Sequence, residues 1–414
     1  MAAGSPDRNS DTIEAFAGSD ALRPAYAFAW SNEGKKDRLS SCSTREPRQL
    51  TEAGSPEYVG SNPRAWADAV DFLFKLQSYL KANIPDLAGS LRLAQVSGGQ
   101  SNPTYIATFD NRKLVVRRKP DGELLPSAHA IDREYRVQEA LGRLGIAVPK
   151  MLLYHPQGDV VGTPFYVMEH IEGRIFSDSG LPSVSVQQRR LMYDSAARML
   201  ASVHDVDIDS AGLATFGKPA GFFARQVGRW TKQWQLSKTQ ELPDVDRLIV
   251  WLADNVPDDP LTTVVHGDFR IGNLIFHPTE PRVVAILDWE LSTLGHPMAD
   301  LAHACVYGWL VAPSEYGGLR GLDLDAEGLP TLAQFASCYY RCVGHGRRLE
   351  AFHLVFALFR NAVIFEGIAA RAKLGNASGD DAQEVGKLAS VFASRALRLI
   401  EHQAAFDELT GFAA

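Results

Sequence analysis

Two aspartates and an asparagine lie in short polar segments between apolar runs. Asp268 and Asn273 fall in "VVHGDFRIGNLIF" (264–276), and Asp288 ends the apolar run of "VVAILDWE" (283–290). Apolar runs that stop at a polar segment are typical of strands that end in a loop. Carboxylate and amide oxygens suit Mg²⁺ that also binds phosphates, and a second carboxylate can orient a hydroxyl or accept its proton. The pattern therefore predicts a phosphoryl-transfer site, with Asp268 facing the hydroxyl and Asn273 and Asp288 as metal ligands.

A glycine-rich segment, "VSGGQSNPTY" (96–105), lies between two short strand-like runs. Glycines at such a turn let backbone N–H groups approach an anion closely. A Gly-Gly pair alone is more typical of a plain hairpin, but its place between the first two strands of a small sheet favours phosphate binding. The predicted contacts are Gly98 and Gly99 through the backbone, and Gln100, Ser101 and Asn102 through side chains.

A cation and a carboxylate follow the glycine-rich segment. The run "LVVRRK" (114–119) is strand-like, and "DREY" (132–135) opens a helical pattern that contains Glu134. A buried cation that contacts phosphates needs a carboxylate to hold it, which Glu134 could supply. The alternative is a solvent-facing Glu134 that pairs with Arg133 or Arg136.

The elements that position these residues indicate an α+β fold with two lobes. Residues 1–62 are rich in Ser, Gly and Pro and predict a mostly disordered extension. Residues 63–173 predict a small antiparallel-sheet lobe with one main helix over 128–145, and residues 174–414 predict a larger, mostly helical lobe. A hairpin inside the helical lobe carries the first motif. A metal-dependent hydrolase using Asp268 and Asp288 would leave the glycine-rich segment and Glu134 without a role.

The composition is that of an ordinary globular protein. Hydrophobic residues make up 45% and charged residues 22%, and the formal net charge is −7. This balance argues against nucleic acid as a partner. The most apolar stretch, "LVFALFRNAVIF", is interrupted by Arg360, and the N-terminus lacks a basic-then-apolar signal pattern, so we expect a cytoplasmic protein that does not bind membranes.

The order of these motifs resembles the aminoglycoside phosphotransferase/choline kinase-like branch of the protein-kinase fold. More narrowly, four segments are similar to the kinase-like domain in front of some acyl-CoA dehydrogenases and to its stand-alone bacterial relatives: "GGQSNPTY", "VVHGDFRIGNLIF", "ILDWELSTLGHPMADLA" and "FRNAVIFEGIAARAKLGNAS". The likeness covers about residues 65–405. It implies a bilobal kinase-like fold, ATP and Mg²⁺ as cofactors, and transfer of the γ-phosphate to a hydroxyl of a small molecule.

The resemblance also implies roles for individual residues. Asp268 becomes the catalytic carboxylate, Asn273 and Asp288 the Mg²⁺ ligands, and Glu134 the partner of the strand cation. Residues that brace the catalytic loop would be His266 and Asp300. The hinge that meets adenine would lie at 168–172, with Met168, Glu169, His170 and Ile171 in contact with the nucleotide.

One position departs from the pattern of protein kinases. The strand cation there is Lys, whereas "LVVRRK" places Arg117 at that point, with Arg118 and Lys119 adjacent. Arg grips phosphates and carboxylates with a planar fork and is not equivalent to Lys. Together with the long extension, Arg117 keeps open a non-catalytic, nucleotide-binding protein as an alternative.

The acceptor is the least constrained part of the prediction. Over residues 336–400 there are nine basic and five acidic residues. This surplus favours an anionic or acyl-CoA-like acceptor over a polycationic aminoglycoside. The resemblance implies a hydroxyacyl-CoA as one candidate, with an aminoglycoside-type antibiotic as the alternative.

Overall fold

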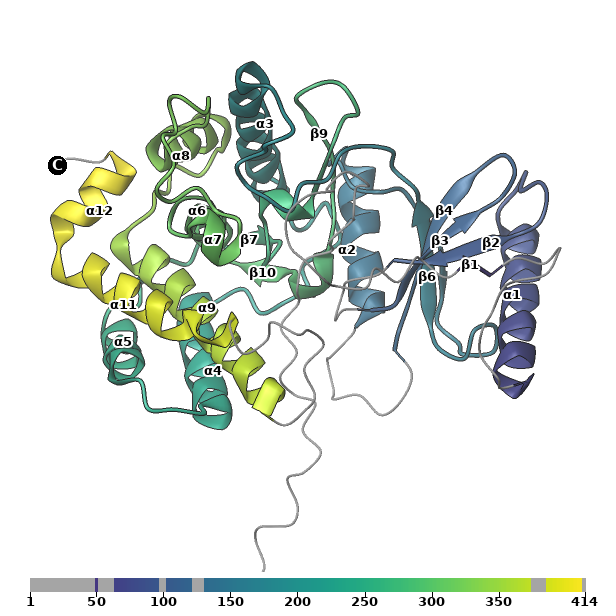
Figure 1. Ribbon diagram of the computed structural model, residues 1–414, viewed down its shortest axis with the longest axis horizontal. Coiled ribbons are helices and arrows are strands. Elements are labelled where there is room, and N and C mark those ends of the chain that lie inside the picture. Colours follow the sequence, from purple (N-terminus) through teal and green to yellow (C-terminus); the bar gives the residue numbers. More distant parts are fainter. Residues whose placement is uncertain (1–48, 51–62, 97–101, 121–129, 374–384, 412–414) are drawn as a thin grey trace, which may run out of the picture.

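The computed structural model describes residues 49–50, 63–96, 102–120, 130–373 and 385–411, in a sheet lobe and a larger helical lobe that lie side by side (Figure 1). The strands of the sheet lobe are β1 (Gln49–Leu50), β2 (Arg92–Gln95), β3 (Thr104–Thr108), β4 (Lys113–Arg118), β5 (Met151–His155) and β6 (Phe165–Glu169). Its helices are α1 (Pro63–Asn83) and α2 (Ile131–Arg143).

The six strands form one antiparallel sheet in the order β1-β2-β3-β4-β6-β5. β2, β3 and β4 form a meander, as the short runs and turn residues of the sequence predict. β1 falls inside the segment predicted to be a disordered extension, where Gln49 and Leu50 pair with Ala94 and Leu93. Two residues are too few to show a period, so the sequence carries no signal for this strand.

The alternation of side chains along β4 sends its residues to opposite faces of the sheet. Leu114 and Val116 pack in the cluster that contains Leu76 and Leu80 of α1. Val115 packs on the other face in a cluster with Ile131 of α2. Because Arg117 shares the parity of Val115, its side chain leaves the sheet on the α2 face, toward the helical lobe.

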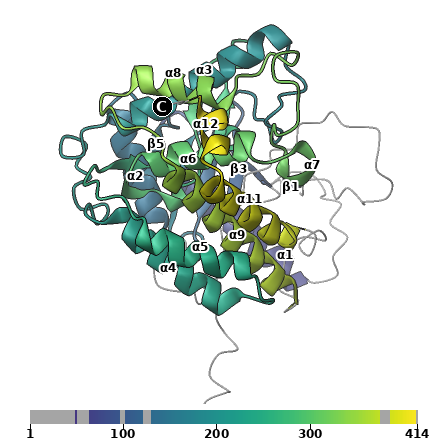
Figure 2. The ribbon, with the colours of Figure 1, turned by 90° about the vertical axis from the view of Figure 1, so that its left-hand side faces the viewer.

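The helical lobe is built around long helices with two small sheets inserted between them. Its helices are α3 (Val186–His204), α4 (Phe222–Ser237), α5 (Pro243–Asp254), α6 (Met298–Trp309), α7 (Pro313–Tyr316), α8 (Leu332–Cys342), α9 (Ala351–Lys373), α11 (Leu388–Glu401) and α12 (Gln403–Thr410). The small sheets pair β7 (Thr263–Val265) with β10 (Thr293–Gly295), and β8 (Leu274–Phe276) with β9 (Val283–Ile286). Figure 2 looks onto α9 and α11, which pack together beside α4 and α5.

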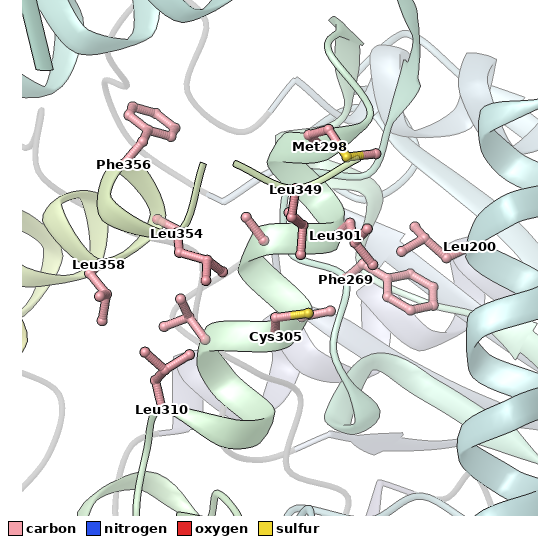
Figure 3. Close-up of a cluster of buried hydrophobic side chains, with 14 of the residues drawn as sticks. Leu200, Phe269, Met298, Leu301, Cys305, Leu310, Leu349, Leu354, Phe356 and Leu358 are labelled. Carbon is pink, nitrogen blue, oxygen red and sulfur yellow. The ribbon is translucent and has the colours of Figure 1, made fainter. Parts of the chain in front are cut away.

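The core of the helical lobe extends to the motif that carries Asp268. Phe269, the next residue, is 1% exposed. Figure 3 shows its ring near Leu200 of α3 and Met298 and Leu301 of α6. Burial of a phenylalanine stabilises by roughly 1.5–3 kcal/mol, so this side chain anchors one side of the loop.

Helix α9 is long and apolar enough to cross a membrane, judged by length and composition, and it is the single helix of this kind in the described part of the chain. Within the helical lobe, however, 89% of its most apolar window is buried. Its apolar composition is therefore accounted for by packing against α6, α4 and α11.

Candidate functional site

Asp268 and Asn273 lie in the loop that joins β7 to β8. The 3-10 helix η1 (Ile271–Asn273) leads directly into β8 and turns the amide of Asn273 back toward Asp268. Asn273 Nδ2 donates to Asp268 Oδ2 at 2.9 Å, and His303 Nε2 donates to Asp268 Oδ1 at 2.7 Å. Both oxygens are thus held, which fixes the plane of a carboxylate that is only 5% exposed.

The surroundings of Asp268 favour its ionised form. Burial alone would raise its pKa, but the hydrogen bond from His303 and the positive charges of Arg270 and Arg360 lower the pKa well below its usual range. Burial also lowers the pKa of His303, so its ring is neutral and donates through Nε2–H. Asp268 is therefore a charged, oriented acceptor of hydrogen bonds at neutral pH.

His266, Gly267 and Asp300 brace this loop. Asp300 accepts hydrogen bonds from the backbone N–H groups of His266 at 2.6 Å and Gly267 at 2.8 Å. His266 Nε2 donates to the carbonyl of Leu287 at 2.8 Å, and burial lowers the pKa of His266. Gly267 has φ +86°, and a Cβ there would lie 2.7 Å from the carbonyl oxygen of Leu291. The loop conformation thus requires glycine at 267.

Asp288 is brought beside Asn273 by the β8–β9 pair. The backbone N–H of Leu287 donates to the carbonyl of Asn273 at 2.8 Å, and Asp288 follows with a left-handed backbone, φ 65°. Asn273 Oδ1 and Asp288 Oδ2 are both buried without a hydrogen-bond partner in the described residues. Burial raises the pKa of Asp288, and the charge of Asp268 adds to this effect. Two unpartnered oxygens, one of them costly to ionise, fit a site for a hard divalent cation.

Arg117 and Glu134 are in direct contact across the α2 face of the sheet. Arg117 Nε lies 2.8 Å from Glu134 Oε2, and both side chains are nearly inaccessible, at 3% and 2% exposure. Tyr166 donates its hydroxyl to the same carboxylate oxygen at 3.0 Å. A surface pairing of Glu134 with Arg133 or Arg136 is therefore wrong, because those guanidinium groups donate to backbone carbonyls of the helical lobe.

Arg117 also connects the two lobes. Its Nη2 atom lies 3.2 Å from Asp288 Oδ1 and 3.2 Å from Glu290 Oε2. Glu290 belongs to the 3-10 helix η2 (Trp289–Leu291), directly after Asp288. One guanidinium thus bridges three carboxylates, and it restrains the candidate metal ligand Asp288 in the process.

The glycine-rich segment is only partly described. Gly98, Gly99, Gln100 and Ser101 lie outside the described residues. Asn102 is 3% exposed, and its Nδ2 donates to Glu134 Oε1 at 2.5 Å. The contact seen for Asn102 is therefore with the Arg117–Glu134 pair.

A cavity between the lobes is lined by the four predicted hinge residues. Met168, Glu169, His170 and Ile171 line it where β6 ends. Further apolar residues of the lining come from both lobes, namely Val115, Pro149, Ile275 and Leu287. Arg117 and Asp288 line the same cavity. An apolar slot with charged groups at its margin suits a flat base attached to phosphates.

A second cavity, of about 390 Å³, lies on the other side of Asp268 in the helical lobe. Helices α4 and α9 supply much of its lining, including Trp230, Arg229 and Arg360. Of the nine basic residues counted over 336–400, all of them described, Arg360 alone lines this cavity. The charge count therefore did not measure the charge of the site: Arg347, for example, pairs with Asp259, and Arg395 with Glu315.

Five side chains at the site were not singled out from the sequence: Arg229, Arg270, Glu290, His303 and Arg360. Three of them carried a signal. Glu290 is part of Asp-Trp-Glu, Arg270 is two residues after Asp268, and His303 is one helical turn after Asp300 and so on the same face. Arg360 lies in the quoted segment "FRNAVIFEGIAARAKLGNAS", to which no site role was assigned, and Arg229 lies outside every quoted motif, on a helix whose packing the sequence does not specify.

Comparisons with known proteins agree with this geometry. Residues 92–335 match the phosphotransferase enzyme family. Acyl-CoA dehydrogenase family member 10 of Mus musculus is 42% identical over 328 residues, which cover 78% of this chain and 30% of the mouse protein. This chain spans less than half the length of the curated relatives that it matches.

Two solved structures extend the comparison. A candidate aminoglycoside phosphotransferase from Ralstonia eutropha is 40% identical with a TM-score of 0.72, and the match covers 79% of this chain and 98% of that chain. Spectinomycin phosphotransferase, solved with ADP and spectinomycin, shares the fold at 12% identity and a TM-score of 0.53, covering 78% of this chain and 98% of that chain. These neighbours confirm the predicted bilobal kinase-like fold, and with the match over residues 92–335 the chain belongs to the phosphotransferase enzyme family.

Proposed function

We propose that this protein is an ATP- and Mg²⁺-dependent kinase that transfers the γ-phosphate to a hydroxyl of a small molecule. The observation that carries the proposal is the position of Asn273. Its amide nitrogen holds Asp268 at the wall of the second cavity, and its amide oxygen is left buried and unpartnered among the described residues beside Asp288. A single side chain thus joins a hydroxyl-orienting carboxylate to a candidate cation site.

The other residues of the site take roles that follow from their contacts. Asn273 and Asp288 would hold Mg²⁺, which when bound neutralises charge on the phosphates. Residues 168–171 line the slot for the base, and Arg117, held by Glu134, lies at its phosphate end. Gly98, Gly99, Gln100 and Ser101 stay predicted phosphate contacts.

Asp268 orients the acceptor hydroxyl more than it withdraws its proton early. The lowered pKa makes this carboxylate a weak base, so it holds the O–H by a hydrogen bond while the oxygen attacks phosphorus. The proton moves to Asp268 only as the new O–P bond forms and the bond to the leaving phosphate oxygen breaks. This order fits phosphoryl transfer, in which positioning and charge stabilisation supply most of the catalysis.

The first acceptor class that we propose is a hydroxyacyl-CoA. Its support is the similarity to relatives that are named acyl-CoA dehydrogenase family members. The assay is ADP release with a panel of 3- and 4-hydroxyacyl-CoAs, free hydroxy acids and aminoglycosides.

Asp268→Asn tests the function. We expect turnover with the active acceptor to fall by roughly 10²–10⁴-fold, because the oriented base is lost. Thermal stabilisation by ATP and Mg²⁺ should persist, since Asn273 and Asp288 are unchanged. Asp258→Asn, the same change at an exposed position, is the control and should leave turnover unchanged. Full turnover by Asp268→Asn would show that another group acts on the hydroxyl, and ADP release without any acceptor would favour a hydrolase.

A further inference from the structure

Two arginines share one indole ring in the second cavity. The guanidinium carbon of Arg229 lies 5.7 Å from the ring centroid of Trp230, and that of Arg360 lies 5.6 Å from it. Arg229 projects from α4 and is exposed, whereas Arg360 comes from α9 and is only partly exposed. Two positive charges from different helices therefore converge on one aromatic wall of the cavity.

The carboxylates of this cavity have other partners. Asp268 is held by Asn273 and His303, Glu290 pairs with Arg117, and Asp300 holds the backbone of the catalytic loop. Neither Arg229 nor Arg360 forms an ion pair with any carboxylate of the described residues. Desolvation and, after it, the nearby charge of Arg360 lower the pKa of Arg229, so the two cations repel each other, although the ionised Asp268 lies near Arg360. An anion would relieve this repulsion.

Arg360 places the anion near the reacting hydroxyl. One of its nitrogens, Nη2, donates to the carbonyl of Gly267 at 2.7 Å, and Gly267 directly precedes Asp268. The Nε atom of Arg360 is buried and makes no hydrogen bond to the described residues. The guanidinium is thus anchored to the catalytic loop on one side and still has donors to offer on the other.

We propose that Arg229, Trp230 and Arg360 form a subsite for an anionic group of the acceptor, with carboxylate or phosphate oxygens held by the two guanidinium forks. Arg is suited to such oxygens because its planar fork can donate two parallel hydrogen bonds. Trp230 packs against the apolar part of the same molecule. This inference rests on the proposed function and narrows it to acidic hydroxylated molecules, which excludes polycationic aminoglycosides.

Binding can be measured separately from phosphoryl transfer by calorimetry, with a non-hydrolysable ATP analogue and Mg²⁺ present. The probes are 3-hydroxybutyrate, 3-hydroxybutyryl-CoA, the neutral methyl ester of 3-hydroxybutyrate, and kanamycin. We expect at least one of the two anions to bind about tenfold or more tightly than the ester, as for a charge-assisted contact. A preference for the free acid identifies a carboxylate as the bound group, and competition by CoA alone identifies the phosphates.

The variant Arg229→Gln should remove the preference for anions, because it takes away one of the two guanidinium groups that hold the anion. Arg229 is exposed on α4, so its replacement leaves the core intact. Lys232→Gln makes the same charge change three residues further along α4, outside the cavity lining, and should keep the preference. Three results would each overturn the subsite. They are equal affinity for the anions and the ester, no binding of either anion, and an unchanged preference for anions in Arg229→Gln. Anion binding that depends on Arg229 without ADP release would refute the proposed function and leave the subsite standing. Turnover of the neutral ester or kanamycin without any preference for anions would overturn the subsite and leave the proposed function standing.

Discussion

Replacing Arg117 with lysine tests whether the two lobes are held together by the shape of the guanidinium group and not only by its positive charge. Arg117 reaches Glu134 through Nε at 2.8 Å, and Asp288 and Glu290 through Nη2 at 3.2 Å each. The nitrogens of a guanidinium donate in several directions within one plane, whereas the ammonium of lysine is a single point. Lysine can therefore approach the carboxylates but cannot satisfy all three at once.

The magnitude follows from burial. Arg117 is 3% exposed, so water cannot replace a lost contact there. A hydrogen bond to a charged group contributes about 1.5–3 kcal/mol net, and the retained charge of lysine offsets part of the loss. We expect Arg117→Lys to lower the free energy of unfolding by about 2 kcal/mol. Arg117→Met should cost more, about 3–5 kcal/mol, because it leaves buried carboxylates without any counter-charge.

Urea denaturation followed by circular dichroism provides the measurement, with Arg92→Lys as the matched control. Arg92 lies on β2 of the same sheet and forms an exposed pair with Asp110 at 3.6 Å, so its replacement should cost less than about 0.5 kcal/mol. If Arg117→Lys is as stable as the wild type, or no less stable than Arg92→Lys, the bridging role of the fork is refuted.

Two further predictions concern buried groups of the helical lobe. Burial lowers the pKa of His353 from 6.5 to about 3, so below pH 6.5 the unfolded chain binds a proton that the folded chain does not, and stability falls as the pH falls. Between pH 7 and pH 5 the wild type should lose about 2 kcal/mol more than His353→Gln in urea titrations, and equal slopes would contradict this. Tyr339 Oη lies 2.6 Å from His204 Nδ1, and His204 Nε2 lies 3.3 Å from Asp300. Tyr339→Phe should lower the unfolding free energy by about 1–2 kcal/mol and reduce kcat with little change in the KM for ATP; an unchanged kcat would show that the contact does not support the catalytic loop.

The motifs near Asp268 and Asp288 could be predicted because their signal is local. A polar residue that interrupts an apolar β-branched run marks the end of a strand wherever the strand lies in the fold. The pairing of Arg117 with Glu134 was predictable for a related reason. Alternation along β4 sends Arg117 to the same face as Val115, which is the face that α2 covers.

The acceptor cavity could not be predicted in the same way. Two of its arginines, Arg229 and Arg360, lie on α4 and α9, which are separated by more than a hundred residues. Which face of a helix meets a cavity depends on how the helices pack, and a sum of charges along the sequence does not contain this information. For this reason the basic surplus over 336–400 pointed to an anionic acceptor through residues that mostly lie elsewhere.

Because the acceptor residues come from other elements than the reacting groups, specificity and catalysis are only partly coupled. Asp268, Asn273 and Asp288 lie in the two segments that flank the β8–β9 pair, so residues of α4 such as Arg229 can change without moving the reacting groups. Arg360 differs, because the guanidinium that faces the cavity also donates to the carbonyl of Gly267 in the catalytic loop. Changes at Arg229 should therefore alter acceptor affinity alone, whereas changes at Arg360 should alter affinity and kcat together. A protein of this design can change its acceptor most readily through α4.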